Sequence, residues 1–329
     1  MMERAGTVPT PIPGSEPDTA RSWQIVLAAA GGAERIAAAN QSASFALGED
    51  GQLRPVLPGE DALVGWHPET GWAPLVSPDD PRHALLDLYL PICSATAARP
   101  LTVGHLGLSL DGFIATHSGE SQFVTGHENI LHLHRMRALC DAVVVGAGTV
   151  AADNPQLTTR LVPGPNPLRV VFDPARRLTT EYRIFSDDEV PTWYFCARSL
   201  IRSGESQMGA ARIIGFDDGQ TGAAVADMLQ RLRAHGCVRV FVEGGGVTVS
   251  AFLEANLLDR LQMAIAPLII GDGRPAIRVP ARANLHDCLR PRYRVFRMGG
   301  DVLFDCELAS DEPHHDRARP DMPPVARVI

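Results

Sequence analysis

The sequence predicts an α/β fold built on a mostly parallel sheet. From Leu101 onward, short apolar runs rich in β-branched residues recur, with helical or loop segments between most of them. This alternation is typical of a parallel sheet. The last two runs are separated only by Gly299 and Gly300, which predicts an antiparallel hairpin at one edge of the sheet. The predicted strands cover residues 101–108, 142–146, 168–173, 192–196, 211–215, 237–242, 261–270, 293–298 and 301–308.

The composition is that of a globular protein and argues against several function classes. The 329 residues are 45% hydrophobic and 21% charged, with a formal net charge of −8. There is no basic excess to neutralise a phosphate backbone, so we expect no nucleic-acid partner. No signal peptide and no apolar stretch of about 18 residues is found, so we expect a cytoplasmic protein without a membrane span.

The spacing of the cysteines predicts that their side chains are free thiols. The chain has six, far apart, several inside apolar runs, and none in a Cys-x-x-Cys pair. Widely spaced cysteines of this kind are typical of buried thiols in a reducing compartment. Disulfide and zinc frameworks need closer or paired spacings.

The composition of the segments outside the predicted sheet indicates how the chain divides into parts. The first residues hold Pro, Gly, Thr and Ser without periodicity, which predicts disorder. A helix-favouring stretch at 23–39 is interrupted by Gly31 and Gly32, and no catalytic constellation follows it before the sheet begins. The predicted parts are a disordered leader at 1–20, a small N-terminal module at 21–98, the main domain at 99–308 and a flexible tail at 309–329.

A helix of about three turns is predicted over residues 126–140, because Ile130 and Leu133 recur at helical spacing. Arg135 and Arg137 lie near its C-terminal end, where positive charge stabilises the helix dipole. For Arg137 the residues leave this role and a functional role equally open.

Motifs for metal binding or nucleophilic catalysis are absent from the sequence. His132 and His134 are two residues apart, so on a helix they point in different directions, which does not suit a shared metal ion. There is no Gly-x-Ser-x-Gly, no His-Glu-x-x-His and no Ser-His-Asp arrangement. We therefore expect no metal site and no hydrolase.

A glycine-rich turn follows the predicted strand at 142–146. The Gly146-Ala147-Gly148 sequence lacks the third glycine of a dinucleotide fingerprint, and Asp153-Asn154-Pro155 ends any long helix there. This is not an ordinary Rossmann loop, and a turn without a ligand is one interpretation.

A second glycine loop follows Glu243 at residues 244–246 and opens a helix predicted over 247–258. Free N–H groups at a helix start attract anions, and glycine permits close approach of a pyrophosphate. The alternative is a simple strand-to-helix turn. Three consecutive glycines are costly in entropy, which favours a phosphate cradle. Glu243 lies where a parallel sheet places its ligand crevice, or is an exposed turn residue.

Asp153 and Arg160 bracket one short loop. Arginine suits bidentate phosphate binding. On their own, the two residues are better explained as a turn-forming acid and a surface cation.

Seven motifs occur in a fixed order and together resemble the reductase domain of the bacterial bifunctional riboflavin-biosynthesis deaminase–reductase. The resemblance covers roughly residues 99–308. Its motifs are residues 109–112, 118–121, 134–138, 145–155, 166–173, 243–246 and 265–271.

The resemblance implies a dihydrofolate-reductase-like fold and an NADPH-dependent reduction of 5-amino-6-(5-phosphoribosylamino)uracil, a small phosphorylated substrate. It also implies a homodimer joined through the edge of the sheet. By position, the cofactor-binding residues are Gly107, Phe123, Thr149, Asp153, Gly245, Gly246, Val247 and Thr248, within a loop that runs to Ala251. The substrate-binding residues are Ser121, Arg137, Leu157, Arg160 and Glu243. Asp153 and Glu243 are the candidate catalytic residues.

The chain departs from the family pattern at three places. Phe113 stands where Lys or Arg often follows Ser-Leu-Asp-Gly, which removes a cation near the expected substrate pocket. Phe123 stands where Trp is common. Residues 1–98 lack the His-x-Glu and Pro-Cys-x-x-Cys pattern of the zinc deaminase, so the N-terminal module is something else.

Two alternative functions follow from these departures. One is a reductase of the same fold acting on another heterocycle, such as a pterin or a modified flavin precursor, and Phe113 motivates it. The other is a non-catalytic, cofactor-binding regulatory protein. Arg198 and Arg202 are candidates for holding the 2′-phosphate of NADPH, although solvated surface charge explains them better.

Overall fold

The structure is a computed structural model that describes residues 17–57, 60–122 and 124–308. The chain divides into two compact units, at residues 1–94 and 95–329. Helix α1 begins at Pro17, before the predicted end of the leader at residue 20, which corrects that boundary. The rest of the leader, Phe123 and the predicted tail lie outside the described residues.

The first unit holds two helices and an antiparallel sheet of order β2-β1-β3-β4. In it, Trp66 and Trp72 are register partners, and both are buried. Helix α1 runs unbroken through Gly31 and Gly32, so the predicted interruption is wrong. A glycine pair weakens a helix, but buried residues on either side of it, such as Val26 and Ile36, hold this one together. The elements are α1 (Pro17–Ala38), β1 (Ala43–Leu47), β2 (Leu53–Val56), β3 (Val64–His67), β4 (Gly71–Pro74) and α2 (His83–Cys93).

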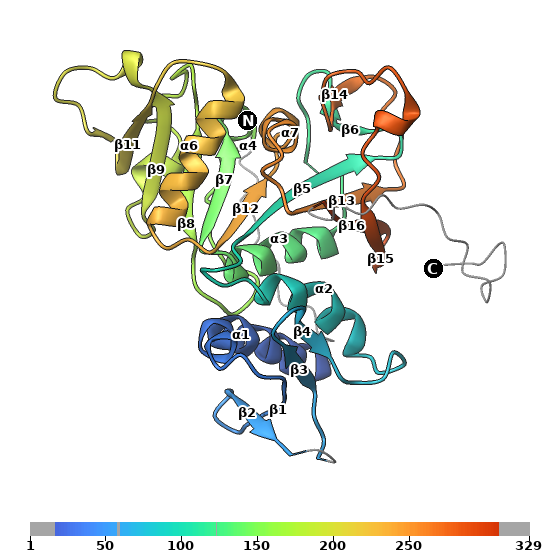
Figure 1. The fold of residues 1–329 in the computed structure, drawn as a ribbon. Coiled ribbons are helices and arrows are strands. Elements are labelled where there is room, and N and C mark those ends of the chain that lie inside the picture. Colours follow the sequence, from blue (N-terminus) through green and yellow to red (C-terminus); the bar gives the residue numbers. More distant parts are fainter. Residues whose placement is uncertain (1–16, 58–59, 123, 309–329) are drawn as a thin grey trace, which may run out of the picture. The chain divides into compact units, whose positions relative to one another are not determined.

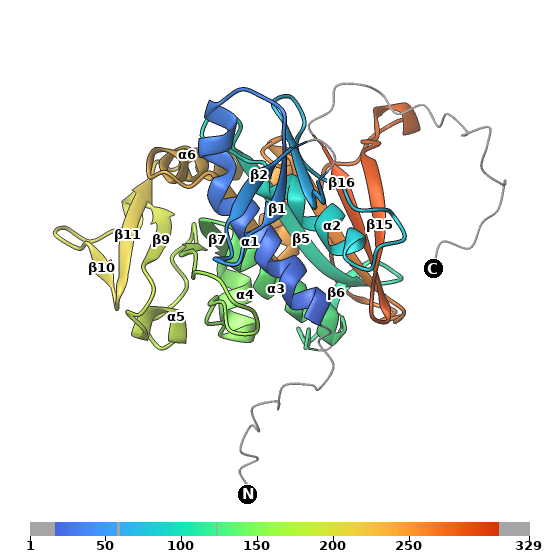
Figure 2. The ribbon, with the colours of Figure 1, turned by 90° about the horizontal axis from the view of Figure 1, so that it is seen from below.

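The second unit is built on a ten-stranded sheet of order β10-β11-β9-β8-β7-β12-β5-β13-β16-β15. The pairings from β11 through β13 are parallel, and β10, β16 and β15 pair antiparallel. Figure 2 shows β10–β11 and β15–β16 at opposite ends of this sheet. Its strands are β5 (Leu101–Ser109), β7 (Ala142–Gly146), β8 (Leu168–Phe172), β9 (Thr192–Ala197), β10 (Gln207–Met208), β11 (Ala211–Phe216), β12 (Arg239–Glu243), β13 (Arg260–Ala266), β15 (Arg292–Met298) and β16 (Asp301–Glu307).

This topology confirms the predicted fold class, including the C-terminal antiparallel hairpin. The chief correction concerns β13, which ends at Ala266 and not at residue 270. Pro267 has no N–H for a ladder, and the N–H groups of Ile270 and Gly271 bond to the carboxylate of Asp111 instead. The sequence patterns also missed the two-residue strand β10 and the small separate sheet of β6 (Phe113–Thr116) and β14 (Gly273–Pro275).

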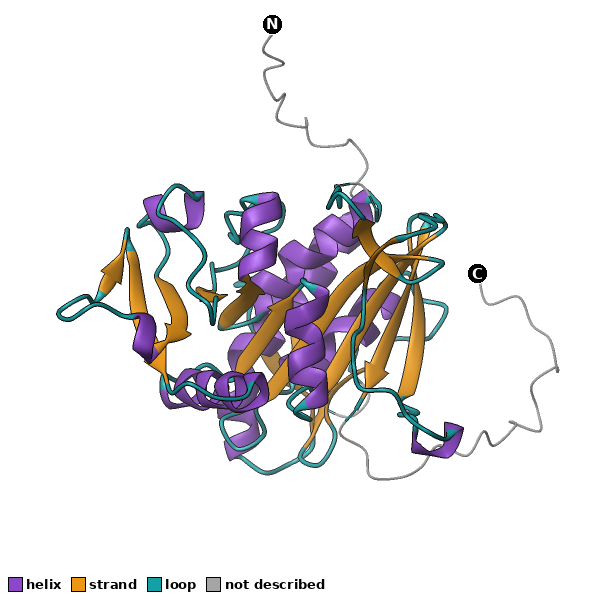
Figure 3. Ribbon diagram, turned by 90° about the horizontal axis from the view of Figure 1, so that it is seen from above, coloured by secondary structure: helices purple, strands orange, loops and turns teal. Residues whose placement is uncertain are grey.

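Helices cover both faces of the large sheet (Figures 1 and 3). Helices α6 and α7 pack into a core with alternate strand residues, among them Val242. Helix α3 lies on the opposite face, where Asn129 hydrogen bonds to His105 of β5. Successive strand residues point to opposite faces, so Glu243 faces α3. The helices of this unit are α3 (His127–Leu139), α4 (Ala147–Asp153), α5 (Arg183–Ser186), α6 (Thr221–Ala234) and α7 (Gly246–Glu254). Helix α7 ends before residue 258, the predicted end.

No helix in the described part of the chain combines the length and the apolar character needed to cross a membrane. None of the six cysteines is in a disulfide, and all but Cys288 are buried.

Candidate functional site

The predicted site residues gather where three neighbouring strands end. Strands β7, β12 and β5 are adjacent and parallel, and their carboxyl ends lead into α4, the glycine loop 244–246 and the turn 109–112. The crevice beside the carboxyl ends of such strands is the usual ligand site of an open α/β sheet. The fold therefore brings together segments far apart in the sequence.

Arg137 and Glu243 form a buried ion pair in this crevice. Their side chains are 8% and 12% exposed. Arg137 Nε donates to Glu243 Oε2 at 2.6 Å, and its Nη2 donates to the other carboxylate oxygen. Its Nη1 donates to the carbonyl of Thr158 at 3.1 Å. Arg137 is therefore not a surface charge, and its guanidinium fork is already engaged by a carboxylate.

Arg160 lies next to this pair. Its N–H donates to His134 Nδ1 at 3.0 Å, and its Nη1 donates to Thr158 Oγ1 at 2.6 Å. Burial, together with the guanidiniums of Arg137 and Arg160, lowers the pKa of His134 to about 3. A neutral imidazole results, as its role as acceptor requires. Thr158 thus links both arginines, one through its carbonyl and one through its hydroxyl.

The loop between α4 and Arg160 has unusual backbone geometry. Asn154 and Leu157 have φ angles of 44° and 56°, in the left-handed region that costs most residues free energy. Leu157 is buried, and the carbonyl of Gln156 beside it accepts a hydrogen bond from Arg169 at 3.3 Å. Neighbouring structure therefore holds the loop in a conformation that it would not favour alone.

The side chains of Ser121 and Asp153 are in contact, although the two residues are far apart in the sequence. Ser121 Oγ donates to Asp153 Oδ1 at 2.9 Å, and Asp153 is the last residue of α4. Thr149 lies one turn earlier on the same helix. The fold therefore places both Ser121 and Thr149 next to Asp153, which acts as a hydrogen-bond acceptor.

The packing around the glycine loop explains its glycines. Gly244 and Gly245 have φ angles of 75° and 76°, which suit glycine. A Cβ on Gly245 would lie 2.9 Å from Thr149 Oγ1, and one on Gly246 would lie 2.4 Å from the carbonyl oxygen of Ala276. Backbone conformation and packing account for all three glycines, so their number alone is no argument for a ligand.

The free backbone donors of this loop are a better argument for anion binding. Thr248 N and Val249 N both donate to the carbonyl of Gly245. Within the described residues, the N–H groups of Gly245, Gly246 and Val247 have no hydrogen-bond acceptor. They lie at the start of α7, where the helix dipole is positive, and Val247 is 67% exposed. The site therefore fits a phosphate or pyrophosphate group.

Gly107 lies on β5, and neighbouring side chains fill the space that a side chain at this position would take. A Cβ there would lie 2.9 Å from Thr125 Cγ2 and 3.4 Å from Asn129 Nδ2. The absence of a side chain at residue 107 makes room for these two residues.

Hydrogen bonds to the Asp111 side chain stabilise the turn after β5. Ser109 Oγ donates to Asp111 Oδ1 at 2.5 Å, and Asp111 also accepts from the N–H groups of Ile270 and Gly271 at 3.1 and 2.6 Å. The Ser109 hydrogen bond and these N–H groups lower the pKa of Asp111 to about 2. Asp111 therefore clamps two segments of the chain together.

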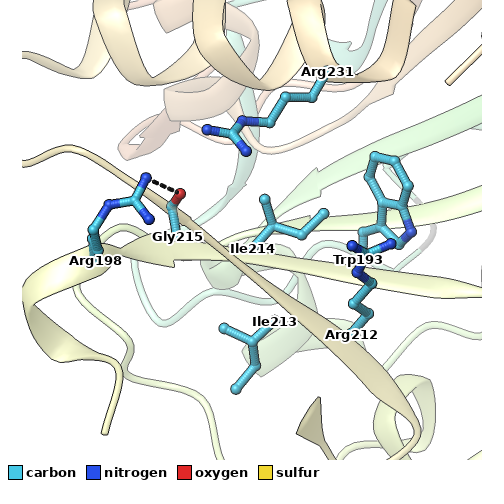
Figure 4. A pocket seen from close by; sticks show the side chains of 7 residues that line it. All are labelled: Trp193, Arg198, Arg212, Ile213, Ile214, Gly215 and Arg231. Carbon is cyan, nitrogen blue, oxygen red and sulfur yellow. Dashed lines mark hydrogen bonds between the residues drawn. The ribbon is translucent and has the colours of Figure 1, made fainter. Parts of the chain in front are cut away.

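A hollow of about 270 Å³ lies between α6 and the strands β9 and β11, lined by arginines and Trp193 (Figure 4). Arg198, a candidate for the 2′-phosphate, lies there and binds Asp217 at 2.9 Å and the carbonyl of Gly215 at 3.1 Å. Its paired state agrees with a surface-charge role. The N–H of Arg202 donates to Glu205.

Sequence reasoning missed several neighbours of the site. Thr158 and Asn154 carry no motif signal of their own, and Arg183 belongs to a different segment, in α5. His134 belongs to one of the motifs of the resemblance, but no sequence pattern indicates the hydrogen bond that it accepts from the N–H of Arg160. In the described residues no group of three or more His, Cys, Asp or Glu side chains is arranged to hold a metal ion.

The fold and this crevice define a reductase domain of the dihydrofolate-reductase-like type. The chain belongs to the family of the RibD C-terminal domain, whose family model matches residues 103–288. The predicted resemblance is thereby confirmed.

Named relatives agree with this assignment. The chain is 32% identical over 215 residues to the 2,5-diamino-6-ribosylamino-4(3H)-pyrimidinone 5′-phosphate reductase of Methanothermobacter thermautotrophicus. The matched region covers 63% of this chain and 97% of that protein. It is 33% identical to the riboflavin biosynthesis protein RibD of Bacillus amyloliquefaciens over 50% of this chain and 44% of that protein. The chain therefore spans nearly all of the archaeal reductase and less than half of the RibD protein.

A solved structure shares the fold. The deaminase/5-amino-6-(5-phosphoribosylamino)uracil reductase of Thermotoga maritima matches with a TM-score of 0.52 and 27% identity, over 64% of this chain and 57% of that one.

Proposed function

We propose that this protein is a reductase of a phosphorylated ribosylaminopyrimidine, acting in riboflavin biosynthesis with NADPH. The observation that carries the proposal is the buried Arg137–Glu243 pair beside the free N–H groups that open α7. A polar, partly buried carboxylate suits the hydrogen-bond donors of an aminopyrimidine or its ribose. The names of the relatives, and their match over 63% and 64% of this chain, support the same substrate class.

The cofactor and the substrate take different sides of the crevice in this proposal. The N–H groups of Gly245, Gly246 and Val247 hold the cofactor pyrophosphate, with Thr149 and Thr248 beside them. NADPH supplies the hydride when bound. The contacts of Gly107 and Phe123 with the cofactor stay predictions from the resemblance.

Glu243 orients the substrate, and the two hydrogen bonds from Arg137 hold the Glu243 carboxylate in place. Ser121, Leu157 and Arg160 complete the proposed substrate side. Asp153 holds the Ser121 hydroxyl, and this pair is the candidate path for the proton that accompanies hydride transfer. Most of the rate enhancement then comes from binding and orientation, because the hydride chemistry belongs to the cofactor.

The preference for NADPH over NADH, the dimeric state and the cytoplasmic location are parts of the proposal that rest on the resemblance. For a homodimer, the edge strand β15 offers unpaired backbone groups. Free, buried cysteines suit a reducing compartment.

The test is turnover by the purified protein. NADPH oxidation is followed at its absorbance band with 2,5-diamino-6-ribosylamino-4(3H)-pyrimidinone 5′-phosphate and, separately, with 5-amino-6-(5-phosphoribosylamino)uracil. We expect turnover of at least one, with a lower KM for NADPH than for NADH. Glu243→Gln should abolish turnover and leave NADPH binding intact. Binding of NADPH without turnover of either pyrimidine would contradict the proposal.

A further inference from the structure

Strand β14 contacts both the start of α7 and strand β6. A Cβ on Gly246, the first residue of α7, would lie 2.7 Å from the carbonyl oxygen of Pro275 in β14. Strand β14 also pairs antiparallel with β6, where Arg274 is opposite Ala115. One short strand therefore touches the glycine loop and the strand that leads towards Ser121.

A turn at residues 117–120 connects β6 to Ser121. The carbonyl of Thr116, the last residue of β6, accepts a hydrogen bond from the N–H of Gly119 at 3.0 Å. The hydroxyl of Thr116 accepts one from the N–H of Glu120 at 3.1 Å. These bonds fix the shape of the turn, but both end on Thr116 at its base and leave its position relative to the site open.

The guanidinium of Arg274 lies directly against this turn. A Cβ on Gly119 would lie 2.5 Å from the Nη2 of Arg274, 2.8 Å from its Cζ and 3.1 Å from its Nη1. The planar group therefore fills the space that a side chain at residue 119 would take. Gly119 also has a φ of 98°, so the backbone conformation and this contact both require glycine here.

Packing against the turn, and not an ion pair, fixes the Arg274 side chain. In the described part of the chain, no carboxylate lies within ion-pair distance of its guanidinium, and the residue is exposed. Arginine suits such a contact because its planar head group is weakly hydrated and packs flat on other groups. The contact with Gly119 is therefore the interaction that joins the turn to β14 at this point.

We propose that Arg274 is a positioning residue that holds the 117–120 turn against β14, so that the Ser121 hydroxyl stays within reach of Asp153. Ser121 Oγ donates to Asp153 Oδ1 at 2.9 Å. The inference rests on the proposed function, in which Ser121 lies on the substrate side of the crevice. Loss of the guanidinium frees the turn from β14, and Ser121 then spends less time at Asp153.

A kinetic cycle tests whether Arg274 acts through Ser121. In Arg274→Met, which keeps an aliphatic stem and removes the guanidinium, we expect kcat/KM for the phosphorylated pyrimidine to fall roughly 3- to 10-fold, the range for one lost neutral hydrogen bond. In a Ser121→Ala protein, Arg274→Met should cause no further fall. An unchanged kcat/KM in Arg274→Met, or the same fall in both backgrounds, would overturn the inference, because Arg274 would then not act through Ser121.

Hydrogen exchange separates this inference from the function itself. The hydrogen-bonded N–H groups of Gly119 and Glu120 report on the turn directly. In Arg274→Met their exchange should speed up roughly fivefold, as for the loss of one contact from a locally opening segment. Arg282→Met is the matched control, because Arg282 is also exposed and lies in the segment after β14, and it should leave this exchange unchanged.

The two measurements can fail independently. If neither pyrimidine is turned over, the proposed function fails, and hydrogen exchange alone decides the role of Arg274. Equal exchange at Gly119 and Glu120 in Arg274→Met and in the unchanged protein would show that Arg274 does not hold the turn.

Discussion

Arg137 and Glu243, 106 residues apart in the chain, share two hydrogen bonds in the buried centre of the crevice. One comes from α3 and the other from the end of β12, so the pair joins a helix to the sheet that it covers. The pair also places a carboxylate next to the glycine loop in a fixed orientation. Its contribution to stability and its contribution to binding can be measured separately.

Breaking this pair should destabilise the fold. Arg137→Met leaves the Glu243 carboxylate buried without a partner, and Glu243→Gln leaves the Arg137 guanidinium buried without its counter-charge. Each should lower the free energy of unfolding by about 3 kcal/mol or more. The double variant should lose less than the sum of the two. Urea denaturation of all four proteins gives the coupling energy, and strict additivity would show that the two side chains do not interact.

Acid should destabilise the protein through three histidines. Burial lowers the pKa of His105 to about 3 and of His132 to about 4, and His134 has a pKa of about 3. Unfolded imidazoles titrate near 6.5, so the unfolded chain binds more protons over this interval. Stability should be complete above pH 6.5 and fall towards pH 4, by up to about 1.4 kcal/mol per pH unit for each histidine.

Unfolding midpoints measured between pH 7.5 and 4.5 test this expectation. His105→Gln should reduce the slope of stability against pH. His286→Gln is the control, because His286 is exposed on the surface, with 79% of its side chain accessible, and it should leave the slope unchanged. A slope that stays the same in His105→Gln would count against a neutral buried imidazole.

Gly245→Ala should weaken cofactor binding. The new Cβ would meet Thr149 Oγ1 at 2.9 Å, on a backbone that costs an L-residue about 1–2 kcal/mol. Gly236→Ala is a matched control, because Gly236 also has a positive φ, of 93°, but open space around it. Both variants should lose stability, and only Gly245→Ala should raise the Kd for NADPH in a fluorescence titration. Equal Kd values in the two variants would refute this role of the loop.

Arg169→Met should loosen the loop that carries Leu157. Arg169 is fully buried and binds Asp187 at 2.8 Å as well as the carbonyl of Gln156. Its removal leaves buried acceptors unpaired, at a cost of about 3–5 kcal/mol. Hydrogen exchange should speed up over residues 154–160. Arg282→Met removes an exposed arginine and should change stability by less than about 0.5 kcal/mol.

The strands of the sheet could be predicted because apolar periodicity reports burial directly. The short strands β6, β10 and β14 could not, because they are too short to show a period. The positions of Glu243 and the glycine loop followed from the rule that ligands bind at strand ends. The pairing of Arg137 with Glu243 could not be predicted, because charge pairs between distant segments leave no local pattern in the sequence.

The free donors at the start of α7 are backbone groups, and the one side chain among them, that of Val247, points into solvent. Substitution at this residue leaves the three N–H groups in place. Val247 is therefore a position where protein engineering can add a charge, a spectroscopic label or a steric block to the cofactor side of the crevice. If the proposed cofactor site is right, such changes should alter nucleotide binding without disturbing the buried core beneath.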